Sequence, residues 1–228
     1  METSARTIVL DLDGTLIDTA PRHYALYARL SETFNVEVLN FQNYWNLRRT
    51  GSSNVGVLQQ SGLSDEKSGM AEEIWRREIE SPPLLQLDRV LPGVAQWLHD
   101  WDGAVQFALI TVRSHAEAVR EQLSRLELLR HFTDILVVGH GSDAENIKAR
   151  AARGHLRHHP VAWVGDTELD IEAARELGCR SIGVTSGIRT AERLRRAGAD
   201  DVVDSVTAIQ AWPALSICDS LGDSAHRR

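Results

Sequence analysis

The sequence predicts an α/β protein: a doubly wound parallel sheet flanked by helices, with a small helical domain inserted into it. Three observations indicate this class. Short apolar runs recur along the 228 residues. In the second half of the chain these runs alternate with amphipathic helix patterns, which is the signature of a doubly wound domain. After the first run, a long stretch of helix patterns breaks the alternation.

Six apolar runs are predicted to be strands. Most are four to six residues long, nearly all apolar, and bounded by Gly, Asp, Thr or Pro. Continuous apolar runs of this length are typical of strands that are buried on both faces of a parallel sheet. The predicted strands are Thr7–Leu10, Val105–Ile110, Ile135–Val138, Val161–Val164, Ser181–Val184 and Val202–Val203.

Helix patterns lie between the later runs. Ser114–Leu126 begins on a serine, which favours an N-terminal cap, and its apolar residues recur at helical spacing. Two further helices are expected to end before Gly178 and Gly198, because glycine readily adopts the left-handed conformation that closes a helix. These two are Leu169–Leu177 and Thr190–Ala197, and Ala144–Ala152 is also predicted to be a helix.

The helical stretch after the first run is predicted to be an inserted cap domain at residues 17–88, which leaves 1–16 and 89–228 as the α/β core. The expected hinges between the two are Asp18–Thr19 and Ser81–Arg89. Within the cap, helix patterns occur at Pro21–Phe34, Asn54–Ser61 and Asp65–Glu80.

Composition excludes several classes of protein. Hydrophobic residues make up 43% and charged residues 25%, so a folded globular chain is expected. The net charge of −7 speaks against a nucleic-acid partner, and no run approaches the length of a membrane-spanning helix. Two cysteines, Cys179 and Cys218, are too few for a disulfide framework. We therefore expect a cytoplasmic protein, with the polar residues 216–228 fraying at its end.

The first predicted strand runs into two carboxylates and a glycine, Asp11, Asp13 and Gly14. Ligands of open α/β sheets bind outside the carboxyl ends of the strands, so these side chains stand where chemistry usually occurs. Two neighbouring carboxylates are stabilised by a divalent cation and can take different roles when their pKa values separate. An ordinary Asp-rich turn would have the same composition.

A second acidic pair, Asp166 and Asp170, follows the strand at Val161–Val164 and opens the next helix. The two residues are four apart and so share one face of the first helical turn. Acids at a helix start are also favoured by the helix dipole alone. Acids at the ends of two parallel strands nevertheless predict a shared site for a hard cation such as Mg²⁺.

Two single residues complete the set. Thr111 ends the strand at Val105–Ile110 just before a helix, where a hydroxyl and free backbone N–H groups can bind a phosphate oxygen. Lys148 is one of only two lysines in the chain, the other being Lys67. This scarcity favours a specific need for a compact positive charge at Lys148, although a solvated helix lysine is the ordinary alternative.

Taken in order, these residues resemble the four motifs of the haloacid dehalogenase superfamily, and most closely its phosphoglycolate-phosphatase-like members with a helical cap. The resemblance covers the core from Ile8 to about Val206. It implies a Rossmann-like core and a Mg²⁺-dependent phosphatase that hydrolyses a small phosphorylated metabolite through an aspartyl-phosphate. One departure is Val112, where the family often has Asn, so side-chain positioning beside Thr111 must differ.

The resemblance also implies individual roles. Asp11 would be the nucleophile and Asp13 the general acid and base, while Asp170 would support the site. The phosphoryl group would be bound by Asp11, Gly14, Thr111 and Lys148, and the metal by Asp11, Asp13 and Asp166. In and near the cap, the residues that could face the substrate are His23, Arg49 and Arg113.

Other functions remain open on the same motifs. A β-phosphoglucomutase-type enzyme would use the same nucleophile but return the phosphoryl group to a sugar. A dehalogenase would have no use for Asp13 as an acid, and a phosphonatase would need a cap lysine, for which Lys67 sits in an exposed turn pattern. A catalytically silent binding module is a further alternative, since a fold does not fix a function. The chain is expected to be a monomer or homodimer.

Two further groups of residues, one of histidines and one of tryptophans, are expected to have structural rather than catalytic roles. His155, His158 and His159 precede Pro160 in a predicted loop and lack the ordered spacing of a metal site. The tryptophans at 45, 75, 97 and 101 are expected to pack in the core or between cap and core.

Overall fold

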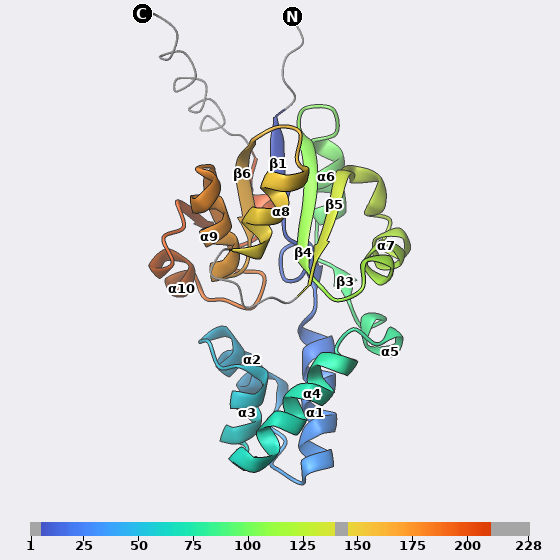
Figure 1. The fold of residues 1–228 in the computed structure, drawn as a ribbon, viewed down its shortest axis with the longest axis vertical. Coiled ribbons are helices and arrows are strands. Elements are labelled where there is room, and N and C mark those ends of the chain that lie inside the picture. The colour runs from blue at the N-terminus through green and yellow to red at the C-terminus, as the bar shows by residue number, and fades with distance from the viewer. Residues whose placement is uncertain (1–5, 140–145, 211–228) are drawn as a thin grey trace, which may run out of the picture.

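The computed structural model describes residues 6–139 and 146–210. Six parallel strands form the central sheet: β1 (Thr7–Leu10), β4 (Gln106–Val112), β5 (Phe132–Val138), β6 (Pro160–Gly165), β7 (Arg180–Val184) and β8 (Asp201–Val203). Their order across the sheet is β5-β4-β1-β6-β7-β8. The predicted parallel sheet is confirmed, and the carboxyl ends of its strands point toward the helical segment in Figure 1.

Helices cover both faces of the sheet. On one face, α6 (Val94–Asp100) and α7 (Ala116–Arg125) contribute apolar side chains to the same cluster as β1, β4 and β7. On the other, α8 (Ile147–His155) and α9 (Glu168–Leu177) pack small alanines against Trp163 of β6. α10 (Ala191–Arg196) contacts β7 and β8, and short 3-10 turns occur at Leu129–His131 and Val206–Ala208. The fold is therefore doubly wound, as predicted.

The element boundaries differ from the predicted ones where caps decide them. α8 begins at Ile147 rather than Ala144, because the Asn146 side chain accepts hydrogen bonds from the N–H groups of the first turn. Residues 144 and 145 of the predicted helix lie outside the described residues. α6 was not predicted, because it is a single short segment that begins after Gly93 in the left-handed region.

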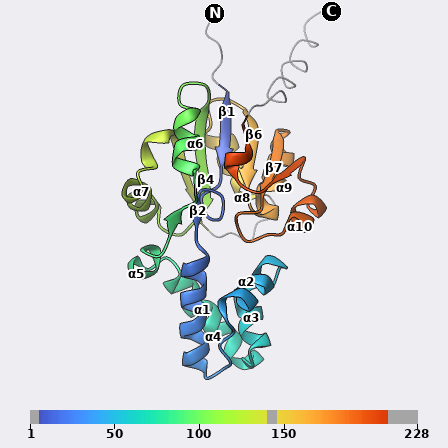
Figure 2. The ribbon, with the colours of Figure 1, turned by 180° about the vertical axis from the view of Figure 1, so that it is seen from behind.

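The segment between β2 (Ile17–Asp18) and β3 (Arg89–Val90) carries five helices: α1 (Ala20–Phe34), α2 (Phe41–Arg49), α3 (Asn54–Gln60), α4 (Asp65–Glu78) and α5 (Pro82–Leu85). Their apolar side chains form a cluster of their own, separate from the clusters on the sheet. A short antiparallel ribbon of β2 (Ile17–Asp18) and β3 (Arg89–Val90) joins this cap to the core. Figure 2 shows the cap standing clear of the sheet from the opposite side.

The inserted domain at 17–88 stays a prediction; the ribbon of β2 and β3 lies at its two ends, and the apolar cluster of the cap helices is separate from those of the sheet. α2 was not predicted, because its nine residues are mostly polar and aromatic and carry no clear apolar stripe. Arg48 and Arg49 form the last turn of α2. Trp75 packs in the cap cluster and Trp97 in the sheet cluster, as expected.

No helix of the described ranges, 6–139 and 146–210, combines the length and the apolar character that a membrane span requires. Cys179 is buried against the alanines of α8 and α9. Cys218 and the polar segment 216–228 lie outside the described residues.

Candidate active site

Three buried carboxylates meet at the carboxyl end of the sheet. Asp11 directly follows β1, Asp166 follows the adjacent strand β6, and Asp170 lies in the first turn of α9. One ligand oxygen from each lies within 4.8 Å of the others. Because β1 and β6 are parallel neighbours, their carboxyl ends deliver these groups to one point. It is the one group of three or more acid, histidine or cysteine side chains at metal-binding spacing within residues 6–139 and 146–210.

Lys148 enters this acidic group from the first turn of α8. Its Nζ atom donates to Asp11 Oδ1 at 2.7 Å and to Asp170 Oδ1 at 2.6 Å. The side chain is buried, and the two carboxylates hold the pKa of the Lys148 ammonium above its ordinary value. The lysine that the sequence singled out by its scarcity therefore bridges the predicted nucleophile and the supporting acid.

One ammonium does not neutralise three buried carboxylates. Burial raises the pKa of Asp11 to about 7, because desolvation and the neighbouring Asp170 outweigh the attraction of Lys148. Burial and the charges of Asp11 and Asp170 also raise the pKa of Asp166 well above its usual range. A divalent cation would remove this excess negative charge, and carboxylate oxygens are the ligands that Mg²⁺ prefers. The donor set therefore fits a hard divalent cation.

Asp170 is held rigidly by its neighbours. Its Oδ2 atom accepts hydrogen bonds from the backbone N–H of Thr167 at 3.2 Å and from the Thr167 hydroxyl at 2.6 Å. Its Oδ1 atom also accepts from the indole N–H of Trp163 at 3.2 Å. The capping box that starts α9 thus orients the carboxylate that Lys148 contacts. The helix dipole favours an acid at this position, but it does not explain the contacts of Asp170 with Lys148 and Trp163.

Gly14, which the resemblance implies binds phosphate, forms a tight turn beside Asp166. Its backbone N–H donates to the Ile17 carbonyl at 2.8 Å, and it lines neither of the cavities described below. Its φ of 73° lies in the left-handed region, and a Cβ atom here would collide with the Asp166 carboxylate. The glycine is required for the tight turn and for close packing of Asp166.

Thr111, at the end of β4, joins these groups around a cavity of about 220 Å³. Asp11, Lys148 and Asp166 line the same cavity, and Thr111 is buried. The four motifs that are separated along the chain therefore converge. Val112 also lines the cavity and presents an apolar side chain there.

Asp13 does not join the three carboxylates but is bound by two arginines. Arg113 Nη2 donates to Asp13 Oδ1 at 2.6 Å, and Arg22 Nη2 donates to Oδ2 at 3.1 Å. These guanidinium groups hold the pKa of Asp13 well below its usual range, despite burial. The metal set expected from the resemblance therefore differs from the group that the structure assembles, in which Asp170 stands in place of the Asp13 carboxylate.

The same two arginines share a second acid that sequence reasoning missed. Asp88, just before β3, is fully buried and lies 3.3 Å from Arg22 Nε and 3.8 Å from Arg113 Nη2. Burial raises its pKa to about 6, and Gln122 donates a hydrogen bond to it at 2.6 Å. One signal was available: Arg22 lies on the apolar stripe of α1 with Leu26 and Leu30, where an arginine indicates a buried ion pair.

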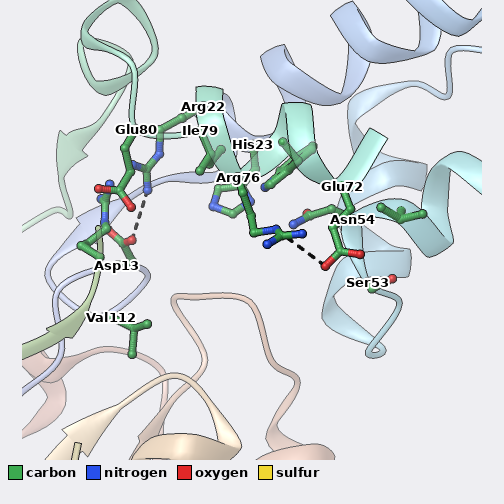
Figure 3. Close-up of a pocket in the computed structure, with 13 residues that line it drawn as sticks. Asp13, Arg22, His23, Ser53, Asn54, Glu72, Arg76, Ile79, Glu80 and Val112 are labelled. Atoms are coloured by element: carbon green, nitrogen blue, oxygen red, sulfur yellow. Dashed lines mark hydrogen bonds and ion pairs between the residues drawn. The ribbon is translucent and has the colours of Figure 1, made fainter. Parts of the chain in front are cut away.

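A larger cavity of about 830 Å³ opens between the cap and the core beside the first one. The two share Asp13, His23 and Val112. Figure 3 shows Asp13, Arg22 and Glu80 at one end of this cavity, with Arg76, Glu72 and Asn54 toward the other. The predicted substrate residues His23 and Arg113 line it.

Arg49, the third predicted substrate residue, lines neither cavity. Its Nη2 atom donates to the Arg189 carbonyl of the core at 3.3 Å. In return, Arg193 donates to the Thr50 carbonyl at 2.9 Å, and both core arginines are paired with Glu168. The end of α2 therefore docks on the core, a contact between distant segments that local sequence patterns do not reveal.

The histidine-rich loop carries no metal group in the described structure. His155 bonds to the carbonyl of Ala151 at 3.0 Å, and His159 to the carbonyl of Leu177 at 2.6 Å. His158 is exposed. His155 is the last residue of α8, and the contact of His159 ties the following loop to the end of α9.

Comparisons with known proteins agree with this architecture. The family model for haloacid dehalogenase-like hydrolases matches residues 5–178. Phosphoglycolate phosphatase of Synechococcus elongatus is 26% identical over 203 residues, covering 88% of this chain and 93% of the relative. The Escherichia coli protein of the same name is 25% identical, with 93% of each covered.

The solved structures agree in fold. A haloacid dehalogenase-like hydrolase from Streptococcus pneumoniae superposes with a TM-score of 0.72 at 20% identity, covering 91% of this chain and 97% of that one. The family model spans most of the sheet, the whole cap and all four motifs. This chain belongs to the haloacid dehalogenase-like hydrolases.

Proposed function

We propose that this protein is a Mg²⁺-dependent phosphatase that hydrolyses a small phosphorylated metabolite through an aspartyl-phosphate on Asp11. The observation that carries the proposal is the buried contact between Asp11 and Lys148 beside two further acids, on the wall of a cavity of about 220 Å³. The relatives named phosphoglycolate phosphatase support phosphate-ester chemistry.

The residues of the acidic group would each contribute to holding the metal. Asp11 and Asp166 would ligate the ion, and Asp170 would support it from the position that Lys148, Trp163 and Thr167 impose. When bound, Mg²⁺ supplies positive charge between an anionic nucleophile and an anionic phosphoryl group. Lys148 supplies further positive charge, and the Thr111 hydroxyl can donate to a phosphoryl oxygen.

In the first step, a carboxylate oxygen of Asp11 attacks phosphorus and the bond to the ester oxygen breaks. The leaving alkoxide takes a proton from the carboxyl group of Asp13. In the second step, the Asp13 carboxylate takes a proton from water. The water oxygen attacks phosphorus, the bond to Asp11 breaks, and inorganic phosphate leaves. Asp13 ends the cycle protonated, so both steps balance.

The two steps need different protonation states of Asp13, and contact with the two arginines favours only one of them. Contact with Arg22 and Arg113 favours the carboxylate, which is the form that the second step needs. The first step needs the protonated form, so the contact with arginine must weaken before the leaving group departs. Because Arg22 belongs to the cap helix α1 and Arg113 to the core, cap movement would change this contact.

The test is phosphate release from a panel of phosphorylated metabolites, with Mg²⁺ and with EDTA. We expect release from at least one metabolite in Mg²⁺ and loss of that release in EDTA or in Asp11→Asn, since an amide is not a nucleophile. Conversion of a sugar phosphate to its isomer without net phosphate release would instead establish the mutase. No release from any ester would establish a catalytically silent module.

A further inference from the structure

The larger cavity adjoins the phosphoryl site, and its lining identifies what else the substrate carries; this inference rests on the proposed phosphatase function. Its walls come from α1, the start of α3, α4 and the end of β4. A phosphate ester held at Asp11 can extend only past Asp13 and His23, which both cavities share, to reach this space. The cavity therefore receives the alcohol part of the ester.

Each arginine of the cavity wall forms an ion pair with an acid. Arg22 and Arg113 bind Asp13 and lie close to Asp88, and Arg76 Nε lies 3.9 Å from Glu72 Oε1. His23 is neutral, because burial and the nearby arginines lower its pKa well below 6.5.

The remaining acid of the wall, Glu80, accepts from the backbone N–H of Ser114 at 2.8 Å. The described residues that line the cavity thus carry no surplus positive charge. A carboxylate or a second phosphate entering this space would lose its hydration without gaining a free cation.

Buried polar atoms of the wall lack hydrogen-bond partners among the described residues. They are His23 Nδ1, Asn54 Oδ1, Arg22 Nη1 and the Nε atoms of Arg22 and Arg113, and the Arg22 side chain is only 1% exposed. Figure 3 shows Arg22, His23 and Asn54 spread along the cavity rather than gathered at one point. Buried polar groups in folded proteins are generally hydrogen-bonded, so these atoms indicate contact with a ligand or with water.

The hydrogen-bonding capacity of these unpartnered atoms indicates which chemical group of a ligand could contact them. Asn54 Oδ1 can only accept a hydrogen bond, whereas Arg22 Nη1 can only donate. A carboxylate oxygen only accepts, so it would satisfy Arg22 but oppose Asn54. A hydroxyl group both donates and accepts, and so can satisfy the acceptor on Asn54 as well as the arginine donors.

The volume of the cavity also favours a substrate with a large alcohol part. At about 830 Å³ the cavity falls within the range of roughly 300–1,000 Å³ that is usual for ligands much larger than two carbons. Val55, Trp75 and Ile79 supply an apolar wall suited to the C–H face of a ring. The two-carbon alcohol of phosphoglycolate would leave most of this space unfilled.

We propose that the substrate is the monophosphate of an uncharged alcohol that carries several hydroxyl groups and is at least as large as a pentose, a sugar or a nucleoside, and that Asn54, His23 and Arg22 bind its hydroxyls. Phosphoglycolate and sugar bisphosphates are then poor substrates, because each brings a second anionic group to a wall without a free cation.

The first experiment compares substrates that differ only in charge. Sorbitol 6-phosphate and 6-phosphogluconate have the same six-carbon chain, ending in a hydroxymethyl group in one and a carboxylate in the other. We expect kcat/KM to favour sorbitol 6-phosphate by about tenfold or more, and to favour ribose 5-phosphate or adenosine 5′-monophosphate similarly over 2-phosphoglycolate. Whichever of ribose 5-phosphate and adenosine 5′-monophosphate has the higher kcat/KM shows whether the alcohol is a sugar or a nucleoside.

Equal or higher kcat/KM for the acidic member of each pair overturns the inference while leaving the phosphatase function intact. Failure to hydrolyse every ester, p-nitrophenyl phosphate included, refutes the phosphatase function itself. The wild-type comparison needs no variant, so it does not depend on whether a substitution folds.

A matched pair of variants tests the binding residues. Asn54→Ala should lower kcat/KM for the best sugar or nucleoside phosphate by about tenfold more than for p-nitrophenyl phosphate, which has no hydroxyl to lose. Asn46→Ala removes an exposed asparagine of α2 outside the cavity and should leave that ratio unchanged. An equal loss on both substrates in Asn54→Ala, or an unchanged ratio, contradicts the assignment.

Discussion

Removing the charge of Asp11 should destroy activity but stabilise the metal-free protein. Burial raises the pKa of this carboxyl from its ordinary 3.8 to about 7 in the folded state. In the unfolded chain the pKa of Asp11 is near its ordinary value. Between the two pKa values Asp11 is therefore ionised only in the unfolded state, and ionisation lowers the free energy of that state alone. Stability therefore falls as pH rises from about 4 to about 7 and levels off above it.

The magnitude follows from the same two values. Each pH unit between them corresponds to about 1.4 kcal/mol, so the charged Asp11 costs the metal-free fold up to about 4 kcal/mol above pH 7. In Asp11→Asn this cost disappears, while the amide oxygen can still accept from Lys148. For a chain of this size the gain corresponds to a rise of roughly 10 °C in Tm.

The assay is thermal unfolding in EDTA at pH 4 and at pH 8, with Asp100→Asn as control because Asp100 is an exposed carboxylate at the end of α6. Asp11→Asn should match the wild type at pH 4 and exceed it at pH 8. Adding Mg²⁺ should raise the wild-type Tm more than that of the variant, since a ligand stabilises the state that binds it. A lower Tm for Asp11→Asn at pH 8 in EDTA would refute this account of the acidic group.

Three further outcomes are expected. Asp13→Asn should slow hydrolysis of metabolites by roughly 10²–10⁴-fold. With p-nitrophenyl phosphate, whose leaving group needs little protonation, rapid-mixing kinetics should show partial recovery of the first step only. Equal slowing of both steps would contradict the role of Asp13 as the acid. Ca²⁺ should inhibit the Mg²⁺-supported rate, because its longer and more numerous contacts could engage both oxygens of Asp11; full turnover in EDTA would rule out the metal. Arg193→Ala, which removes the contact with Thr50, should raise KM for metabolites, whereas the exposed Arg195→Ala should not; identical steady-state constants would show that this contact does not hold the cap.

Local patterns were sufficient for much of the fold. The strand at Thr7–Leu10 was predicted with its observed bounds, because a strand buried on both faces needs an unbroken apolar run. The short helices α2, α5 and α6 were missed, since each depends on packing against its neighbours rather than on a strong pattern of its own.

The four motifs of the candidate site, and the strand ends that carry them, could be predicted from the residue pattern alone. In a parallel sheet the carboxyl end of each strand lies at the same edge, so the position of Asp11, Thr111 and Asp166 along the chain already implied that they meet. The ion pairs that surround these residues could be found only in the folded structure. Arg22 and Asp88 are distant in sequence and meet because β2 pairs with β3, which places the start of α1 beside the residue that precedes β3. Such a buried ion pair depends on distance and desolvation, which no local pattern encodes.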